Sequence, residues 1–510
     1  MTRKLLLGVD IGTYSSKGVL VNSAGTLVGS SVIAHELSSP KPGHFEHDAD
    51  GIWWHDFVFI VRDLLEKTKV APEEIAGVGT SGIGPCVLPI DDNGKPLRPG
   101  ILYGIDSRAL KEVEYLQNTL MSISNYQHPI PELSSQAAGP KVLWIRRNEP
   151  EIYAKARWFL TSQSYLVYKL TGKAAIDIYS AGGYSPIIDS KTTKYIPELE
   201  PYITEVNKLA DMFWSHEVVG QVTAAASMET GIPAGTPVVA GTTDASAEAL
   251  SAGLGNFDDM LIMFGSSNFF VVKTKELINP KKFWASNFLG PGTYAFLGGM
   301  ATSGSLTRWF LNQFGQPERE ASLKTGRDPY NLLAELSQNS SPGSNGLVML
   351  PYFEGERTPI QDPKAKGLLF GLSLKHTRED VYRSILESVA FGIRHNLEEM
   401  KAEGVIPKRI LAVGGGTKNS SWMQIVSDIA SIELHIPEQQ IGASYGDAFL
   451  AGLGVGMCRE YADISKWVKI KEVIKPNNNN RDVYDFNYTI YRDLYTSTNP
   501  IMHRISDAER

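Results

Sequence analysis

Short turns of glycine, serine and threonine follow several apolar runs in this sequence of 510 residues. Such turns expose backbone N–H groups and hydroxyls, which suit phosphate oxygens. One such turn is more often only a tight turn, but four at the ends of predicted strands favour a nucleotide site. The candidate residues are Gly12, Thr13, Ser15 and Lys17 in the first turn, Gly265 and Ser266 in the second, Gly304 in the third, and Gly415 with the nearby Asn419 in the fourth. The sequence has no G-x-x-x-x-G-K-[ST] phosphate loop, so these turns would bind phosphate without one.

Two aspartates stand where predicted strands end. Asp10 follows an apolar run and precedes the first turn, so its carboxylate would face bound phosphates. Repulsion is avoided if Mg²⁺ lies between them, and Asp10 is therefore predicted to be a magnesium ligand acting through water. Asp244 follows the apolar run 238–241 and fits a general base that deprotonates a hydroxyl. For both aspartates a simple capping role at the next helix stays open, and for Asp244 this alternative is serious.

The elements that position these residues occur twice in the same order. Residues 5–10 and 18–21 read as a hairpin around the first turn, and residues 261–264 and 269–272 repeat that pattern about half a chain later. A later strand also ends in a small-residue turn in each half, at 75–79 and at 410–413. We therefore predict a duplicated α/β fold with domains at 1–254 and 255–510.

Composition narrows the class of protein. The chain is 42% hydrophobic and 21% charged, with a net charge of −7 and no basic run, which argues against a nucleic-acid partner. The longest uncharged stretch, 283–307, is interrupted by Gly290-Pro291-Gly292 and further glycines, so no membrane segment is expected. Two cysteines fit a reducing compartment. The sequence predicts a cytoplasmic globular protein.

Six motifs are spread over about residues 6–456. They are Gly8-Val9-Asp10-Ile11-Gly12-Thr13, Ala240-Gly241-Thr242-Thr243-Asp244, Gly355-Glu356-Arg357-Thr358-Pro359, Gly367-Leu368-Leu369-Phe370-Gly371-Leu372, Leu386-Glu387-Ser388-Val389-Ala390-Phe391 and Gly414-Gly415-Gly416-Thr417-Lys418-Asn419. Together, in their order and spacing, these motifs resemble the FGGY family of carbohydrate kinases. The resemblance implies two ribonuclease-H-like domains of the actin and heat-shock ATPase superfamily. ATP and a sugar would meet in the cleft between these domains.

The resemblance also implies a role for each matched residue. Asp244 matches the catalytic base and Asp10 the acidic residue beside the metal. The nucleotide residues match in two groups: Gly12 and Thr13 with Gly265 and Ser266 as phosphate loops, and Gly304, Gly415 and Asn419 as further nucleotide contacts. The sugar would lie near Ser81, Gly84, Tyr103, Asp106 and Arg108, against Asp244.

Departures from the family pattern fall in the predicted sugar site. Gly84-Pro85 stands where glycerol kinases carry Arg-Glu and many xylulokinases carry Met-His, and the loop 103–108 is one residue longer than the family's Trp-Asn-Asp-x-Arg stretch. These differences argue against glycerol kinase. The resemblance as a whole implies first a xylulokinase-like enzyme acting on a ketopentose such as D-xylulose. Asp106 and Arg108 are predicted to recognise the sugar, the alternative being that they only pair with each other on the surface.

Other functions stay open from the sequence. Within the family the substrate could be gluconate, ribulose, or a polyol such as glycerol or erythritol. From another class, an actin-like or chaperone-like ATPase would share the phosphate turns but not Asp244 or the segment 355–359. The expected partners are ATP, Mg²⁺ and a small sugar, with a homodimer left open.

Overall fold

The computed structural model describes residues 4–123, 128, 130–189, 191–438 and 441–508, and the chain divides into two compact units. The first unit comprises residues 1–255, 286–294 and 441–468, and the second comprises 256–285, 295–440 and 469–510. The predicted domain boundary, at residues 254 and 255, lies beside the first break between the units. Two later segments, 286–294 and 441–468, also belong to the first unit. The second of these segments brings a helix to the predicted site.

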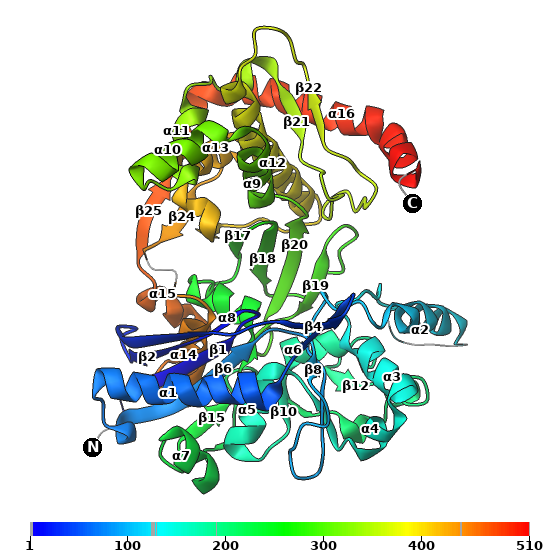
Figure 1. The fold of residues 1–510 in the computed structure, drawn as a ribbon, viewed down its shortest axis with the longest axis vertical. Helices are drawn as coiled ribbons and strands as arrows, with labels where there is room; N and C mark the ends of the chain where they lie inside the picture. The colour runs from blue at the N-terminus through cyan, green and yellow to red at the C-terminus, as the bar shows by residue number, and fades with distance from the viewer. Residues whose placement is uncertain (1–3, 124–127, 129, 190, 439–440, 509–510) are drawn as a thin grey trace. The chain divides into compact units, whose positions relative to one another are not determined.

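A seven-stranded sheet forms the centre of the first unit (Figure 1). Its order is β14-β15-β6-β1-β2-β3, with β16 beside β6. The strands are β1 (Leu5–Ile11), β2 (Ser15–Asn22), β3 (Leu27–Ala34), β6 (Ile75–Gly82), β14 (Val218–Gln221), β15 (Pro237–Val239) and β16 (Thr242–Thr243). The predicted opening hairpin is confirmed, since β1 and β2 pair antiparallel. β1 pairs parallel with β6, and every residue of both strands is buried, as their continuous apolar runs require.

Helices cover both faces of this sheet. α1 (His55–Thr68) packs on β2 and β3, whereas α14 (Ala443–Gly454) packs on β1 and β6. Gly18, opposite Val9 in the hairpin, faces Ile60 of α1, while the neighbouring Gly8 faces Ser444 of α14. Because successive residues of a strand point to opposite faces, α1 and α14 lie on opposite sides of the sheet. The other helices of this unit are α2 (Leu110–Ser122), α3 (Ala138–Asn148), α4 (Pro150–Lys155), α5 (Ser162–Thr171), α6 (Ile178–Ala181), α7 (Ala224–Thr230), α8 (Asp244–Ser251) and α15 (Ile464–Trp467).

Glycines allow α14 to approach the sheet closely. Gly8 of β1 and Gly79 of β6 are register partners. A Cβ atom would lie 1.9 Å from the carbonyl oxygen of Ser444 if added at Gly8, and 2.1 Å from that of Asp447 if added at Gly79. Gly446 likewise lets α14 approach α8, since its Cβ would lie 2.0 Å from the carbonyl oxygen of Ala247. These contacts leave no room for a larger residue.

The second unit repeats the order of strands found in the first. Its sheet runs β19-β20-β18-β17-β23-β24-β25, with β17 antiparallel to β18 and parallel to β23. The strands are β17 (Asp259–Phe264), β18 (Asn268–Thr274), β19 (Trp284–Asn287), β20 (Tyr294–Met300), β23 (Arg409–Val413), β24 (Leu434–Pro437) and β25 (Ile470–Ile474). A hairpin followed by a parallel strand therefore starts both sheets, and the predicted duplicated α/β fold is confirmed.

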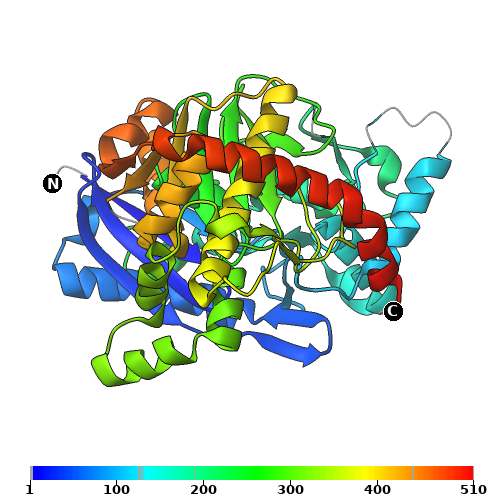
Figure 2. The ribbon, with the colours of Figure 1, turned by 90° about the horizontal axis from the view of Figure 1, so that it is seen from above.

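Long helices complete the second unit. They are α9 (Gly304–Phe314), α10 (Gln316–Thr325), α11 (Pro329–Gln338), α12 (Arg378–Ala402), α13 (Ser420–Ala430) and α16 (Arg481–Ala508). A capping box starts α12, with Thr377 and Asp380 bonded reciprocally. Figure 2 shows α16, in red, as one long helix leading to the C-terminus.

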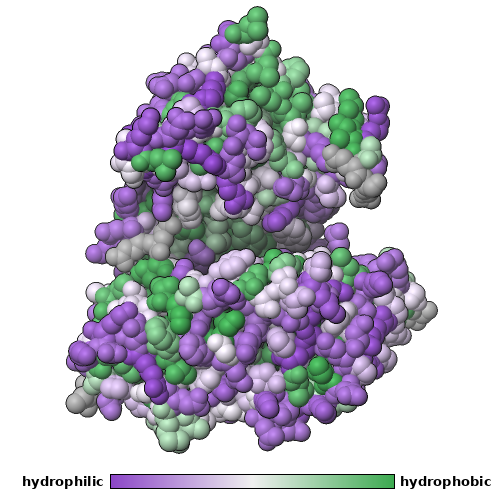
Figure 3. Space-filling view, viewed as in Figure 1, coloured by the Kyte–Doolittle hydropathy of each residue, from purple (hydrophilic) through white to green (hydrophobic). Residues whose placement is uncertain are grey.

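The surfaces of both units are mixed in polarity. On the face seen in Figure 3, groups of hydrophobic side chains lie among hydrophilic ones on each unit. Among the residues that the structure describes, no helix has both the length and the apolar character needed to cross a bilayer.

Candidate functional site

Three adjacent strands of the first unit bring the predicted polar residues to one edge of the sheet. Asp10 of β1 is the register partner of Ser81 of β6, and Ser81 is in turn the partner of Thr242 of β16. Both pairings are parallel, so the carboxyl ends of the strands coincide. Asp244 follows Thr242 by two residues and begins α8. Asp10 and Ser81 therefore lie at the coinciding carboxyl ends of their strands, and Asp244 directly follows the end of β16, as expected for a ligand site of an α/β sheet.

The hydroxyl of Ser81 joins two carboxyl groups. Its Oγ lies 3.0 Å from Oδ1 of Asp10 and 2.7 Å from Oδ2 of Asp447. Asp10 is 8% exposed and Asp447 is fully buried. Burial raises the pKa of Asp10 to about 6, although the Ser81 hydrogen bond and the charge of Lys17 act in the opposite direction. Burial, with the charge of Asp10, raises the pKa of Asp447 well above its ordinary value.

Asp244 is half-buried at the first position of α8. Its Oδ1 accepts a hydrogen bond of 2.8 Å from the N–H of Ala245, the next residue of α8. Asp244 therefore makes a contact of the kind that the capping alternative implies. Burial and then the negative charge of Asp10 raise the pKa of Asp244 to about 8. Such a carboxylate is a stronger base than an ordinary one, which suits the removal of a proton from a hydroxyl.

The first turn is tight and faces the same carboxyl edge. The N–H of Gly12 donates to the carbonyl oxygen of Ser15 over 3.1 Å, and a Cβ atom on Gly12 would lie 2.6 Å from that oxygen. The hydroxyl of Thr13 lies 3.3 Å from that of Tyr103. Lys17 is exposed and is the register partner of Asp10. The structure thus brings one predicted nucleotide residue, Thr13, into contact with one predicted sugar residue, Tyr103.

Two other residues predicted on the sugar side have mainly internal contacts. Ser81 is fully buried, and its hydroxyl is engaged by Asp10 and Asp447. Gly84 is half-buried, and a Cβ added there would lie 2.8 Å from Cγ2 of Thr243. Ser81 therefore orients a carboxylate of the site, and Gly84 makes room beside the residue that precedes Asp244.

Asp106 and Arg108, which are predicted to recognise the sugar, pair with each other inside the first unit. Arg108 donates from Nη2 to Oδ2 of Asp106 over 2.7 Å and from Nη1 to Glu46 over 2.8 Å. The N–H of Phe45 also donates to Oδ2 of Asp106. Both side chains are buried rather than on the surface. Their hydrogen-bonding capacity is used within the unit, as in the alternative of mutual pairing, and they hold the loop 103–108 in place.

The second and third turns, which are predicted to bind the nucleotide, lie together at the end of β17. The N–H of Gly304 donates to the carbonyl oxygen of Gly265, and the N–H groups of Ser303 and Ser305 donate to that of Ser266. Gly304 lies so close that an added Cβ would be 2.6 Å from the oxygen of Gly265. Glu356 supports this region, since its Oε1 accepts from the N–H of Ala301 over 2.7 Å.

The fourth predicted turn leaves the neighbouring strand. Gly414 has φ +95°, and its added Cβ would lie 2.6 Å from the carbonyl oxygen of Phe264, at the end of β17. At Gly415 an added Cβ would meet nothing within 4 Å. Asn419 caps α13, since its Oδ1 accepts from the N–H of Trp422 over 3.0 Å. Asn419 thus has a structural role that its sequence position did not reveal.

Sequence reasoning missed two acidic residues of the site. Asp447 lies on α14, and Glu248 lies one turn after Asp244 on α8, where its charge raises the pKa of Asp244 and of Asp10. A signal for Asp447 was present, because it is the single charged residue in the apolar run 443–454. A lone carboxylate in a buried helix requires a specific partner.

The donor set offers few protein ligands to a metal. Among the described residues no group of three or more His, Cys, Asp or Glu side chains could hold an ion. Mg²⁺ is commonly held by one or two carboxylates together with substrate phosphates and water. Asp10, at the carboxyl edge beside the first turn, fits the predicted role of one such carboxylate.

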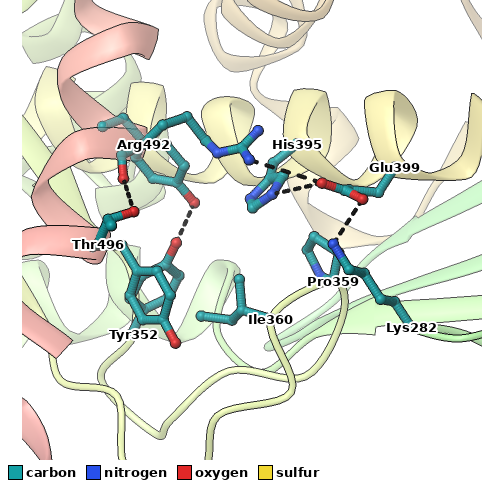
Figure 4. Close-up of a pocket in the computed structure, with 10 residues that line it drawn as sticks. Lys282, Tyr352, Pro359, Ile360, His395, Glu399, Arg492 and Thr496 are labelled. Atoms are coloured by element: carbon teal, nitrogen blue, oxygen red, sulfur yellow. Dashed lines mark hydrogen bonds and ion pairs between the residues drawn. The ribbon is translucent and has the colours of Figure 1, made fainter. Parts of the chain in front are cut away.

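A pocket of about 250 Å³ lies elsewhere in the second unit (Figure 4). Its charged groups pair with one another, since Glu399 contacts Lys282, His395 and Arg492. It is also lined by Tyr352 and other residues, none of which is a predicted site residue. The pocket is therefore not assigned to the predicted reaction.

Comparisons with known proteins cover nearly the whole chain. Residues 5–251 match the N-terminal domain and residues 260–455 the C-terminal domain of the FGGY family of carbohydrate kinases. A xylulose kinase of Staphylococcus epidermidis is 27% identical over 503 residues, covering 98% of each chain. A gluconokinase of Bacillus subtilis is 26% identical over 468 residues, covering 91% of this chain and 90% of the relative. The crystal structure of a xylulose kinase from Rhodospirillum rubrum is similar at 30% identity and a TM-score of 0.87, covering 98% of this chain and 100% of that one.

Proposed function

The chain belongs to the FGGY family of carbohydrate kinases, and we propose that within this family it phosphorylates a ketopentose such as D-xylulose. Membership makes it an ATP-dependent sugar kinase, a phosphotransferase with an alcohol group as acceptor. The actin-like or chaperone-like ATPase considered from the sequence is thereby set aside. The choice of sugar and the roles of individual residues are the proposal.

The relatives support a ketopentose. Those compared over nearly their full length include xylulose kinases of Staphylococcus epidermidis and Rhodospirillum rubrum. The gluconokinase of Bacillus subtilis has nearly the same identity, so a sugar acid is the second candidate. Gly84-Pro85 presents no polar side chain at one wall of the predicted sugar site. A wall of this kind discriminates less between hydroxyl patterns than one that donates hydrogen bonds.

In the proposed mechanism Asp244 acts as the general base. It accepts the proton of the terminal sugar hydroxyl as that oxygen attacks the γ-phosphorus of ATP in line with the leaving ADP oxygen. Thr13 and Tyr103, whose hydroxyls lie 3.3 Å apart, link the first phosphate turn to the sugar side. Mg²⁺ bound to ATP would neutralise phosphate charge, and Asp10 is the residue that would face it. The turns at Gly265 and Gly304 would bind nucleotide phosphates through backbone N–H groups.

The single observation that carries this proposal is the register of β1, β6 and β16. It brings a buried carboxylate, Asp10, and a base with a raised pKa, Asp244, to the carboxyl edge of one sheet. Charged groups of these two kinds at a strand edge suit phosphoryl transfer to a hydroxyl.

Two further expectations accompany the proposal. Both cysteines, Cys86 and Cys458, are buried free thiols, which supports the prediction of a reducing, cytoplasmic compartment. The homodimer left open from the sequence stays open.

The test is a panel of acceptors with coupled detection of ADP. Purified protein with MgATP is given D-xylulose, ribulose, gluconate, erythritol or glycerol, and ATP turnover without acceptor sets the baseline. We expect the highest kcat/KM with D-xylulose and little turnover with glycerol. A preference for gluconate or glycerol would contradict the ketopentose assignment. ADP release that no sugar increases would contradict the kinase role itself.

A further inference from the structure

A buried histidine lies directly behind the turn of Gly12 and Thr13. His35 follows β3, and its side chain is 6% exposed. Its backbone N–H donates to the carbonyl oxygen of Tyr14 over 3.0 Å, and its Nε2 lies 3.1 Å from the carbonyl oxygen of Gly12. The residue is therefore attached to the turn through both its backbone and its side chain.

Both ring nitrogens of His35 face hydrogen-bond acceptors. Nε2 faces the carbonyl oxygen of Gly12, and Nδ1 lies 2.8 Å from Oδ2 of Asp56. A neutral imidazole carries a single N–H, so it could satisfy one of these contacts and would turn a lone pair toward the other oxygen. Only the imidazolium form donates to both.

The surroundings supply a counter-charge for this cation. The side chain of Asp56, in the first turn of α1, is 3% exposed. It also accepts from the hydroxyl of Ser16 over 2.7 Å, and Nδ1 of the exposed His55 lies 3.2 Å away from it. From β5 (His44–His47), the ring of His47 meets that of His35 edge to face at 5.1 Å. Burial and then the charge of His35 lower the pKa of His47 to about 4, so His47 is neutral.

The contact with Gly12 fixes the direction of one backbone donor. In a trans peptide the C=O of one residue and the N–H of the next point in opposite directions. Because the carbonyl of Gly12 points at His35, the N–H of Thr13 points away from it. Among the residues that the structure describes, this N–H has no protein acceptor.

We infer that His35 is a positively charged positioning residue, which aims the N–H of Thr13 at a phosphate oxygen of ATP and adds positive charge behind the turn. The ligand class is the phosphate chain of a nucleoside triphosphate. A cation bonded to the Gly12 carbonyl also polarises the peptide and strengthens its N–H as a donor. The inference rests on the proposed function, because that function assigns the turn to ATP.

The first test reads protonation directly. Protein labelled with ¹⁵N-histidine is compared by NMR with the variant His35→Gln, and the signals missing from the variant are those of His35. We expect both ring nitrogens of His35 to be protonated at neutral pH. Signals from one protonated and one unprotonated ring nitrogen would overturn the inference. The NMR measurement does not depend on catalytic activity.

The second test separates ATP binding from sugar binding. His35→Gln should raise the KM for ATP about ten- to hundredfold, the range expected for loss of a charge-assisted hydrogen bond. The KM for the sugar should stay unchanged. His55→Gln is the matched control, because it removes a histidine beside the same carboxylate without touching Gly12. An unchanged KM for ATP in an active His35→Gln enzyme would overturn the inference and leave the kinase function intact.

Asp56→Asn provides a second route if His35→Gln does not fold. This variant keeps the shape of the side chain but removes the counter-charge of His35. We expect one ring nitrogen of His35 to lose its proton and the KM for ATP to rise, with the sugar KM unchanged. A doubly protonated His35 together with an unchanged KM for ATP would contradict the inferred pairing. Wild-type protein that releases no sugar-dependent ADP would refute the proposed function instead, while the NMR result would still decide the charge.

Discussion

The hydroxyl oxygen of Ser81 lies 2.7 Å from Oδ2 of Asp447, a residue 366 positions later in the chain. The same hydroxyl lies 3.0 Å from Asp10. A hydroxyl carries one proton, so it can donate to only one of the two carboxyl groups at a time. The other oxygen of Asp447 is buried with no partner among the described residues. This arrangement favours a protonated Asp447 that donates to Ser81, which in turn donates to Asp10.

Asp447→Asn tests the protonation of that buried group. The raised pKa means that folded protein holds the proton more tightly than unfolded protein. Wild-type stability is therefore lost as pH rises above the ordinary carboxyl range, whereas the neutral amide is insensitive. We expect the variant to match the wild type near pH 4 and to be more stable at pH 7, measured by urea unfolding. Asp92→Asn, at an exposed carboxylate, is the control. Lower stability of Asp447→Asn at pH 7 would mean that the charged form is the native one.

Gly79→Ala tests the close approach of α14 to the sheet. The new Cβ would lie 2.1 Å from the carbonyl oxygen of Asp447, a backbone atom that cannot move alone. We expect a loss of about 1–3 kcal/mol or more in the free energy of unfolding, and reduced activity because Asp447 and Ser81 separate. Gly182→Ala is the control, since nothing lies within 4 Å of its added Cβ and its φ is −52°. Equal stability of the two variants would show that α14 does not pack as described.

Asp106→Ala should act on stability. The substitution leaves the buried Arg108 without the carboxylate of Asp106. Removing one partner of a buried ion pair lowers the free energy of unfolding by about 3–5 kcal/mol. We expect a clear drop in the urea midpoint, while Asp106→Asn, which keeps an acceptor oxygen, should lose less. Asp92→Ala, at a carboxylate 85% exposed, should leave the midpoint unchanged. A stable Asp106→Ala protein whose sugar KM alone has risen would restore the original prediction of sugar contact.

Much of the fold followed from the sequence because it depends on local patterns. The hairpin of β1 and β2 is encoded by neighbouring residues. The positions of Asp10 and Asp244 also followed, since both end apolar runs. Asp447 and the contacts of Asp106 and Arg108 with Phe45 and Glu46 did not. These partners lie on other elements, and only the folded chain brings those elements together.

Glu248→Gln should shift the pH profile of the reaction. The charge of Glu248 raises the pKa of Asp244 above the value it would otherwise have, so its removal lowers that pKa from about 8. The base must be ionised to act, and activity should then persist to lower pH. We expect the acid limb of kcat/KM for the sugar to move down by a few tenths of a unit to about one unit. Glu114→Gln, at an exposed position of α2, should leave the profile unchanged. A limb that stays in place in Glu248→Gln, or moves to higher pH, would argue against Asp244 as the titrating base.

The central claim, that Asp244 deprotonates the sugar hydroxyl as its oxygen attacks the γ-phosphorus of ATP, is tested most directly by Asp244→Asn. The variant keeps the shape and the hydrogen bond from Ala245 but removes the base. The measurement is the D-xylulose-dependent rate of ADP release at saturating MgATP, with nucleotide binding followed separately by titration. We predict a loss of about 10²–10⁴-fold in kcat with ATP affinity almost unchanged. Near-normal turnover of Asp244→Asn would contradict the assignment.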